Sequence, residues 1–208
     1  SRRQRQMCIR DSNNPASPWP SISMPLDVPH RLRIPRPMAT PPFIINLRSK
    51  IGHDPLWLPG VTVVILRDGS APGAREVLLV RRVDNGQWTP VTGIVDPGEH
   101  PHVAAVREAQ EETRTLITIE SLLNVQAVGP VTYPNGDVTS YVDTAFRASL
   151  RDDSPEVGIG DDESQAVAWC DVNELPDMKP RFRAIIARAC DDADHGGAAS
   201  WGPLPRAE

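Results

Sequence analysis

The sequence contains few cysteines and no long apolar segment. Cys8, Cys170 and Cys190 are the only three cysteines in 208 residues, and they are too few and too scattered for a disulfide framework or a zinc site. No run of 18 apolar residues occurs, so no membrane-spanning helix and no membrane partner are predicted. A reduced, cytoplasmic setting fits these absences best. A nucleophile elbow and a phosphate-binding glycine loop are also lacking, which removes two competing kinds of catalytic site.

The hydrophobic and charged residues indicate one acidic domain with tails. A hydrophobic fraction of 39% over 208 residues is enough for one core. Residues 1–37 hold seven of the 22 basic and two of the 27 acidic residues, so the rest of the chain has 15 basic and 25 acidic residues. This excess of acid argues against stable binding of nucleic acid, which needs lysine and arginine to neutralise phosphates. It is compatible with a small nucleotide bridged by a metal ion.

Residues 1–37 differ in composition from the rest. They contain seven prolines and no periodic apolar pattern, so we predict that they are disordered. Met7–Ser12 resembles the translation of a transposon end used in sequencing-library preparation. We therefore expect residues 1–37 to be non-native or an upstream extension, with Met38 as the natural start. The domain is expected over residues 38–191, followed by a flexible tail over 192–208.

The segment over residues 93–115, GIVDPGEHPHVAAVREAQEETRT, predicts a helix that begins at Pro101. Proline suits the first helical position because it has no N–H group to leave unpaired. Val103 and Val106 are spaced so that both would face a core.

Three carboxylates share one side of this helix, because Glu108, Glu111 and Glu112 stand at positions i, i+3 and i+4. Like charges at this spacing repel unless a cation lies between them. Hard oxygen ligands suit Mg²⁺, with Mn²⁺ as an alternative. Arg107 precedes Glu111 by four residues and could pair with it. The competing interpretation is an ordinary solvated, charged helix face.

The spacing of these residues resembles the Nudix box, G-x5-E-x7-R-E-U-x-E-E-x-G-U, where U is a bulky aliphatic residue. The matching residues are Gly93, Glu99, Arg107, Glu108, Glu111 and Glu112. Arg114 stands where the family has glycine, and Thr115 where it has an aliphatic residue. A glycine after a helix usually adopts a left-handed conformation, so Arg114 should cost about 1 kcal/mol or force another exit from the helix.

The resemblance implies a Nudix α/β/α sandwich, an α/β fold with a mixed β-sheet. It implies that metal is held by Glu108, Glu111, Glu112 and the carbonyl of Gly93, with support from Glu99. Glu111, Glu112 and Arg107 would then take part in catalysis. In many members an acidic residue in a loop outside the box binds metal or acts as general base; Glu163 is our candidate, with Asp162 behind it. The alternative for Glu163 is ordinary loop acidity.

The remaining chain supplies strands, helices and candidate substrate contacts. Apolar patterns predict a helix over residues 43–51, an antiparallel pair over 61–67 and 76–82, a strand over 166–170 and a helix from Pro180 to about Cys190. Arg82, or its neighbour Arg81, could bind substrate phosphates, or both could face solvent.

An Asn-Gly pair predicts a hairpin between residues 122–133 and 138–148. Tyr133, Asn135, Asp137 and Tyr141 resemble a tract found in one branch of Nudix proteins and are candidate substrate contacts. Ordinary hairpin residues would explain the same pattern.

The activity implied is metal-dependent hydrolysis of the pyrophosphate linkage of a nucleoside diphosphate derivative, either an ADP-ribose-like compound or a (deoxy)nucleoside triphosphate. Two alternatives remain open. The first is a Nudix-fold module that senses a nucleotide without cleaving it, and the departure from the motif at Arg114 is the reason to retain it. The second is an RNA-decapping enzyme, which the acidic domain disfavours. Homodimerisation is also left open.

Overall fold

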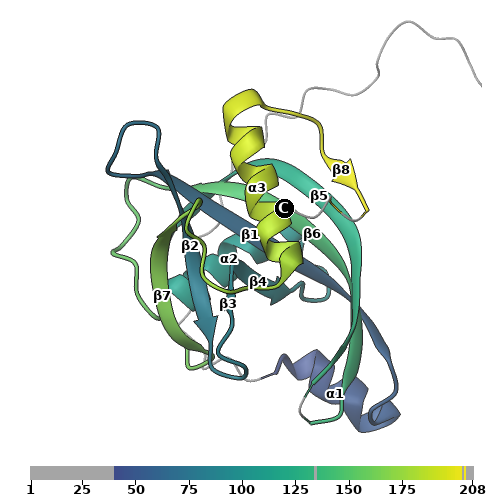
Figure 1. Ribbon diagram of the computed structural model, residues 1–208. Coiled ribbons are helices and arrows are strands. Elements are labelled where there is room, and N and C mark those ends of the chain that lie inside the picture. Colours follow the sequence, from purple (N-terminus) through teal and green to yellow (C-terminus); the bar gives the residue numbers. More distant parts are fainter. Residues whose placement is uncertain (1–39, 134, 203, 205–208) are drawn as a thin grey trace, which may run out of the picture. The chain divides into compact units, whose positions relative to one another are not determined.

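The computed structural model describes residues 40–133, 135–202 and 204, so the predictions for residues 1–37 and Met38 lie outside the described residues. The described chain forms three helices and eight strands (Figure 1). The helices are α1 (Pro42–Ile51), α2 (Pro101–Thr113) and α3 (Pro180–His195). The strands are β1 (Leu56–Asp68), β2 (Arg75–Arg82), β3 (Trp88–Thr89), β4 (Val91–Ile94), β5 (Ile117–Thr132), β6 (Val138–Leu150), β7 (Ser164–Asp171) and β8 (Ser200–Trp201).

All eight strands belong to one mixed sheet. Its central order is β3-β2-β1-β6-β5-β8, with β4 also paired to β1 and β7 also paired to β2. The long β1 and β6 run parallel, while β1 pairs antiparallel with β2 and with β4. The antiparallel pair expected over residues 61–67 and 76–82 is confirmed in direction, but β1 and β2 pair only where 66–68 meets 75–77. The predicted hairpin is confirmed, and β5 and β6 form it.

The central strand β1 separates two hydrophobic cores, because successive side chains point to opposite faces of a sheet. Val61, Val63 and Ile65 pack on one face with Ala104, Ala105 and Ala109 of α2. Val64 and Leu66 pack on the other face with four residues of α3, Phe182, Ile185, Ile186 and Ala189. The two helices therefore cover opposite faces, as Figure 1 shows, and the α/β/α arrangement with a mixed sheet is confirmed.

Two details of the predicted helices differ from the structure. Val103 is 41% exposed, so the expectation that it faces the core was wrong, whereas Val106 packs against the core as expected. The alanines of α2 take the inward positions instead, because small side chains let the helix lie close to the sheet. Helix α3 continues past Cys190 to His195, and Ser200 and Trp201 then pair with β5.

Strand β5 begins at Ile117, five residues before the predicted start, and β6 ends at Leu150 rather than Ala148. Irregularities interrupt the β5–β6 register between Ile119 and Ser121 and between Leu122 and Asn124. Each bulge shifts the alternation of inward and outward residues, so the simple period-two pattern could not reveal the start of the strand. No helix in the described ranges is long and apolar enough to cross a membrane.

Candidate active site

Helix α2 buries two of its acidic residues, Glu108 and Glu112. Glu108 is 2% exposed and Glu112 is 5% exposed. Burial of an ionised carboxylate costs several kcal/mol unless a partner or a cation compensates it. The interpretation of this motif as a solvated helix face is therefore wrong for Glu108 and Glu112, although Glu111 keeps a 29% exposed side chain.

Arg107 joins three of the motif carboxylates. Its Nε and Nη2 donate to the two oxygens of Glu99 at 3.1 and 3.0 Å. Its Nη1 donates to Glu108 Oε1 at 2.8 Å and to Glu111 Oε2 at 3.0 Å, and Nη2 also reaches the carbonyl of Ile94 at 3.0 Å. Burial alone would lower the pKa of Arg107, but its hydrogen bonds to Glu99 and the charge of Glu108 outweigh burial and raise that pKa. The expected pairing with Glu111 is present, and Arg107 has two further carboxylate partners and one carbonyl partner.

The carboxyl group of Glu108 lies directly against Gly93. A Cβ atom on Gly93 would overlap the Glu108 carboxyl group, so only glycine permits this approach. Burial raises the pKa of Glu108 to about 7, although Arg107 opposes the shift. Its Oε2 is buried and has no hydrogen-bond partner among the described residues. This oxygen is left free to accept a ligand.

A second group of charged residues surrounds Glu112. Burial raises the pKa of Glu112 well above its usual value, the charges of Glu108 and Asp161 add to the effect, and Arg82 opposes it. Glu163 also contributes to this shift, and its Oε2 lies 3.9 Å from Arg82 Nη2. The pKa of Glu163 is itself raised, chiefly by burial. The loop before β7 thus brings the predicted Glu163 to the same region as the end of α2.

Asp161, rather than the predicted Asp162, is the second acid of this loop that faces the site. Asp162 is exposed, whereas Asp161 Oδ2 is buried without a hydrogen-bond partner in the described part of the chain. Asp161 Oδ1 accepts the N–H groups of Glu163 and Ser164 at 3.1 and 3.0 Å. Adjacent acids in a loop look alike in sequence, and only the turn direction distinguishes them.

The chemistry of these donors suits a divalent cation, since carboxylate oxygens are its preferred ligands and Glu108 Oε2 lacks any other partner. Within the described residues, however, no group of three histidine, cysteine or acidic side chains is arranged to hold an ion. Arg107 instead lies among Glu99, Glu108 and Glu111. The residue types fit a cation, and binding one would require side chains of this cluster to rearrange.

Tyr133 and Tyr141 form a pair close to the Gly93 backbone. Their hydroxyl groups lie 2.6 Å apart. A Cβ on Gly60 would lie 3.3 Å from the Tyr141 ring and 3.5 Å from the Gly93 carbonyl oxygen, so all three meet at one point on β1. Burial raises the pKa of Tyr141, and its hydrogen bond to Tyr133 adds to this. Two of the four predicted hairpin contacts therefore lie near the box.

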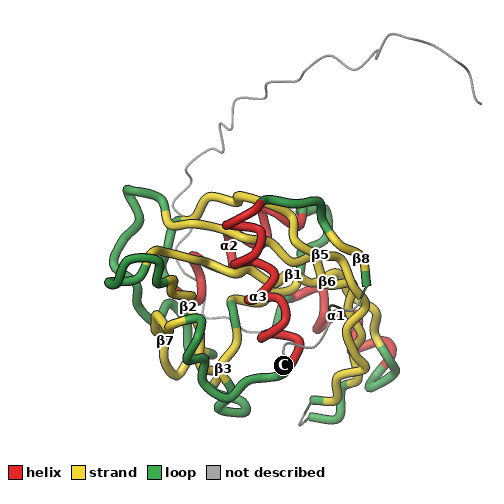
Figure 2. Tube along the Cα trace, turned by 45° about the horizontal axis from the view of Figure 1, so that its top comes forward, coloured by secondary structure: helices red, strands yellow, loops and turns green. Residues whose placement is uncertain are grey.

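Asn135 and Asp137 bond to each other, and Asp137 also contacts residues in and just after α1. Asn135 Nδ2 donates to Asp137 Oδ2 at 3.0 Å, and Asp137 Oδ1 lies 2.8 Å from Nδ1 of His53. Arg48 of α1 lies 3.4 Å from the Asp137 carboxylate. These contacts hold the hairpin turn beside α1 (Figures 1 and 2).

Sequence reasoning missed a buried polar pair on the α3 face. Asp143 is 6% exposed and accepts a hydrogen bond from Thr62 Oγ1 at 2.8 Å. Arg181 Nη1 lies 3.9 Å from Asp143 Oδ2, and its guanidinium stacks on Phe182 at 3.9 Å. The sequence feature that could have revealed this pair is an aspartate among the alternating residues of β6, since a polar residue at a core-facing strand position needs a partner.

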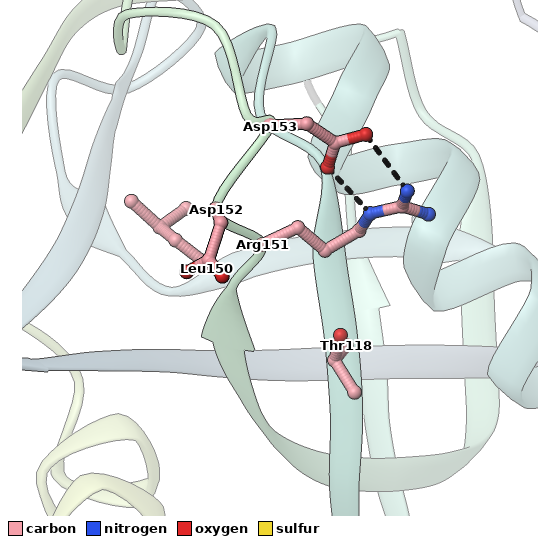
Figure 3. Close-up of a pocket in the computed structure, with 5 residues that line it drawn as sticks. All are labelled: Thr118, Leu150, Arg151, Asp152 and Asp153. Carbon is pink, nitrogen blue, oxygen red and sulfur yellow. Dashed lines mark hydrogen bonds and ion pairs between the residues drawn. The ribbon is translucent and has the colours of Figure 1, made fainter.

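A shallow pocket elsewhere does not belong to this site. Thr118, Leu150, Arg151, Asp152 and Asp153 line it at the ends of β5 and β6 (Figure 3). Arg151 donates two hydrogen bonds of 2.8 Å to Asp153 there. None of its lining residues is a motif residue or a predicted substrate contact.

Comparison with known proteins identifies the family that this fold and motif define. A model of the NUDIX domain matches residues 57–189. A MutT-like protein of Streptomyces ambofaciens is 28% identical over 145 residues, which covers 69% of this chain and 81% of the relative. An ADP-ribose pyrophosphatase of Methanocaldococcus jannaschii is 33% identical over 122 residues, covering 57% and 68% respectively. A crystal structure of an ADP-ribose pyrophosphatase from Streptococcus suis superposes with a TM-score of 0.54 at 13% identity, covering 70% of this chain and 98% of that one.

The last likeness shows the shared fold alone, because its sequence identity is low. The chain belongs to the Nudix family, as the resemblance of residues 93–115 predicted. It is a Nudix-type pyrophosphohydrolase.

Proposed function

We propose that this pyrophosphohydrolase requires a divalent cation, Mg²⁺ or alternatively Mn²⁺, and cleaves the pyrophosphate linkage of a nucleoside diphosphate derivative. Water would add to one phosphorus atom, and the bridging oxygen would leave with the other phosphoryl group and take up a proton. The products would be a nucleoside monophosphate and a phosphorylated remainder, or pyrophosphate from a triphosphate.

The observation that carries this proposal is the burial of Glu108 and Glu112 on one side of α2, with Glu108 Oε2 unpartnered among the described residues. Two buried carboxylates beside each other would destabilise the fold without compensating charge. Arg107 compensates part of this charge through Glu99, Glu108 and Glu111. A bound cation would supply the rest, and it would also neutralise the charge of the pyrophosphate during attack.

The proposed roles of the other residues follow from their positions. Glu108, Glu111, Glu112 and the Gly93 carbonyl would hold the cation, and Arg107 would orient these carboxylates, as would Glu99 by fixing Arg107. Glu163 would accept a proton from the attacking water, since its raised pKa brings it closer to neutral pH, where a general base works best.

Arg82, Tyr133 and Tyr141 would contact the nucleotide. The positively charged guanidinium of Arg82 would bind the phosphates, and the tyrosine pair lies beside the Gly93 carbonyl. Asn135 and Asp137 would act on the substrate indirectly, by holding the hairpin that carries Tyr133.

One relative bears on the class of substrate. The ADP-ribose pyrophosphatase relative favours an ADP-ribose-like compound, and a (deoxy)nucleoside triphosphate stays the second candidate class. The left-handed conformation of Arg114 preserves the usual exit from α2, which weakens the reason for a non-catalytic sensing module. A cytoplasmic setting and homodimer formation stay predictions.

The test is chromatographic detection of nucleoside monophosphate from a panel of ADP-ribose, nucleotide sugars, dinucleoside polyphosphates and the triphosphates, with Mg²⁺, with Mn²⁺ and with a chelator. We expect turnover of one class that the chelator abolishes. Glu111→Gln and Glu112→Gln should each lower kcat by at least about 100-fold, while the exposed Glu174→Gln serves as a matched control. Near-normal rates in both site variants, or full activity with chelator, would refute the proposal.

A further inference from the structure

The C-terminal end of α2 is closed by a loop distant in sequence. The last four carbonyl groups of a helix lack partners within the helix and need others. The N–H group of Arg114 donates to the Gln110 carbonyl at 3.0 Å. The N–H groups of Gly158 and Gly160 donate to the carbonyls of Thr113 and Glu112 at 3.2 and 2.9 Å. The loop between β6 and β7 is thereby attached to the helix that carries the motif carboxylates.

The contact at Gly160 is possible only without a side chain. A Cβ on Gly160 would overlap the carbonyl oxygen of Glu111, which is backbone and cannot move aside cheaply. A Cβ on Gly158 would meet nothing closer than the flexible Arg114 side chain, whose Cδ lies at 3.7 Å. The two glycines make similar hydrogen bonds, but only Gly160 is sterically required to be glycine.

The chain is fixed again at the start of β7, within four residues of Gly160. Ser164 begins β7 and pairs with Arg82 of β2. The carbonyl of Glu163 accepts the Val83 N–H group at 2.8 Å. Asp161, Asp162 and Glu163 therefore bridge two fixed points, Gly160 and Ser164, and the four Cα–Cα steps between these points span at most about 14 Å. A bridge this short leaves little freedom to the backbone that carries Glu163.

We infer that Gly160 is a positioning residue, which docks the loop on α2 and so places the short acidic bridge, Glu163 above all, beside Glu112. This inference rests on the proposed role of Glu163 in catalysis. It also explains how the enzyme keeps its loop in place while Arg114 occupies the position that is glycine in the motif. The two docking hydrogen bonds join backbone groups of Gly158 and Gly160 to those of Thr113 and Glu112, so they do not use the side chain of residue 114.

The experiment compares Gly160→Ala with the matched control Gly158→Ala in the full chain, each with and without Glu163→Gln. We expect Gly160→Ala to lower kcat about 10- to 100-fold with KM changed less than about threefold, because a displacement of about 1 Å can cost that much. Gly158→Ala should retain its rate. In the Glu163→Gln background, Gly160→Ala should cost less than about threefold more, because residues that act as a unit are not additive. Full activity of Gly160→Ala, or additive losses in the double variant, would overturn the inference.

Two further measurements keep the test decisive. Hydrogen exchange of residues 157–163 should become fast in Gly160→Ala and stay slow in Gly158→Ala, whatever the substrate; equal protection in both would overturn the docking role. If wild-type protein hydrolyses no nucleotide, the proposed function fails while hydrogen exchange still decides the docking.

If Gly160→Ala does not fold, a second variant tests the bridge: two glycines inserted between Gly160 and Asp161 lengthen the bridge without disturbing the docking. We expect that insertion to lower kcat, and an unchanged kcat would contradict the role of the bridge.

Discussion

The carboxyl group of Glu108 occupies the space that a side chain on Gly93 would need. Gly93 lies in β4 and Glu108 lies in α2, so this contact fixes the motif helix against the strand whose Gly93 carbonyl is the proposed fourth ligand. The contact has a direct consequence for substitution. A methyl group on Gly93 must push Glu108 out of its place, and with it the Arg107 contacts.

Gly93→Ala is therefore expected to lower kcat/KM by at least about 100-fold. It should also lower the free energy of unfolding by about 1–3 kcal/mol, which is typical of overpacking a core. Steady-state kinetics and thermal unfolding measure the two effects. Gly158→Ala is the control, since its added methyl group has room. Unchanged kinetics in Gly93→Ala would show that the position of Glu108 does not matter for the reaction.

Arg114→Gly is expected to stabilise the enzyme. Arg114 has φ of 60° and ψ of 11°, a left-handed conformation that costs a residue with a side chain roughly 1 kcal/mol. Relief of this strain should raise the melting temperature by about 2–4 °C in a chain of this size. Arg114→Ala keeps the strain and should give no gain. An equal rise in both variants would attribute the effect to the arginine side chain instead of the backbone.

Arg82 and Arg81 should differ sharply in their effect on substrate binding. Arg82 lies 3.9 Å from Glu163, and its charge acts on Glu112, whereas the exposed Arg81 donates to the Gly86 carbonyl at 3.1 Å. Arg82→Ala should raise KM about 10- to 100-fold if the guanidinium binds a phosphate. Arg81→Ala should change KM by less than about twofold. Initial-rate measurements decide this, and similar KM values for both variants would remove Arg82 from the substrate contacts.

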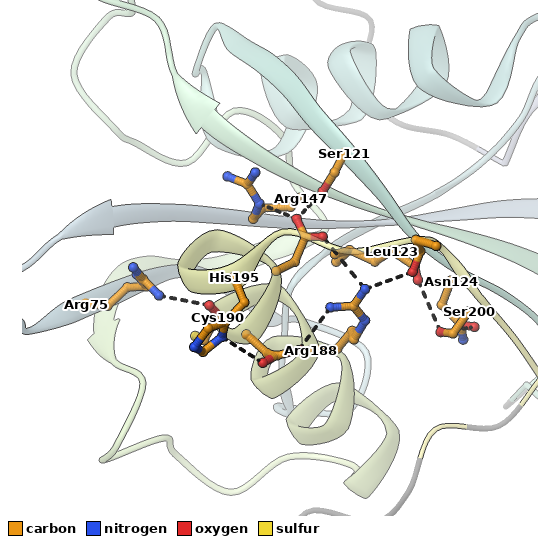
Figure 4. A network of polar contacts seen from close by, with 12 residues as sticks. Arg75, Ser121, Leu123, Asn124, Arg147, Arg188, Cys190, His195 and Ser200 are labelled. Carbon is orange, nitrogen blue, oxygen red and sulfur yellow. Dashed lines mark hydrogen bonds and ion pairs between the residues drawn. The ribbon is translucent and has the colours of Figure 1, made fainter.

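Asp192 should make the stability of the fold depend on acid. Its Oδ2 accepts hydrogen bonds from Ser121 and from Arg147 at 2.5 and 2.8 Å, and Arg188 lies 3.7 Å from Oδ1 (Figure 4). Burial alone would raise the pKa of Asp192, but the Ser121 and Arg147 hydrogen bonds and the Arg188 charge outweigh it, so the pKa is lowered. Its contribution to stability is therefore complete above the unfolded-state pKa of about 3.9 and is lost as pH falls through the lower folded-state pKa.

Asp192→Asn should lower the free energy of unfolding at pH 7 by about 3 kcal/mol, because it leaves Arg147 without its buried partner. It should also flatten the loss of stability below about pH 4. Urea denaturation at several pH values measures both effects. The control is Asp191→Asn, whose carboxylate is 62% exposed, and it should cost less than about 1 kcal/mol. Equal losses in the two variants would contradict a special role for the buried carboxylate.

The local features of the site could be read from the sequence. The start of α2 at Pro101, the shared side of Glu108, Glu111 and Glu112, and the hairpin at the Asn-Gly pair follow from rules that act within a few residues. The family assignment rested on the same local spacing. These predictions held because helix periodicity and turn chemistry need no knowledge of distant partners.

The tertiary structure decided the rest. Which acid of the Asp161–Glu163 bridge faces Glu112, which of two adjacent arginines reaches it, and why Gly160 must lack a side chain all depend on contacts between segments about 50–80 residues apart. Tertiary structure also decided that Val103 is exposed. The inward positions of α2 are occupied by alanines, because the sheet lies close to the helix. The sequence determined which acidic and basic side chains the chain carries. Packing determined which of these side chains come into contact, because burial and distance set the energy of every charged contact.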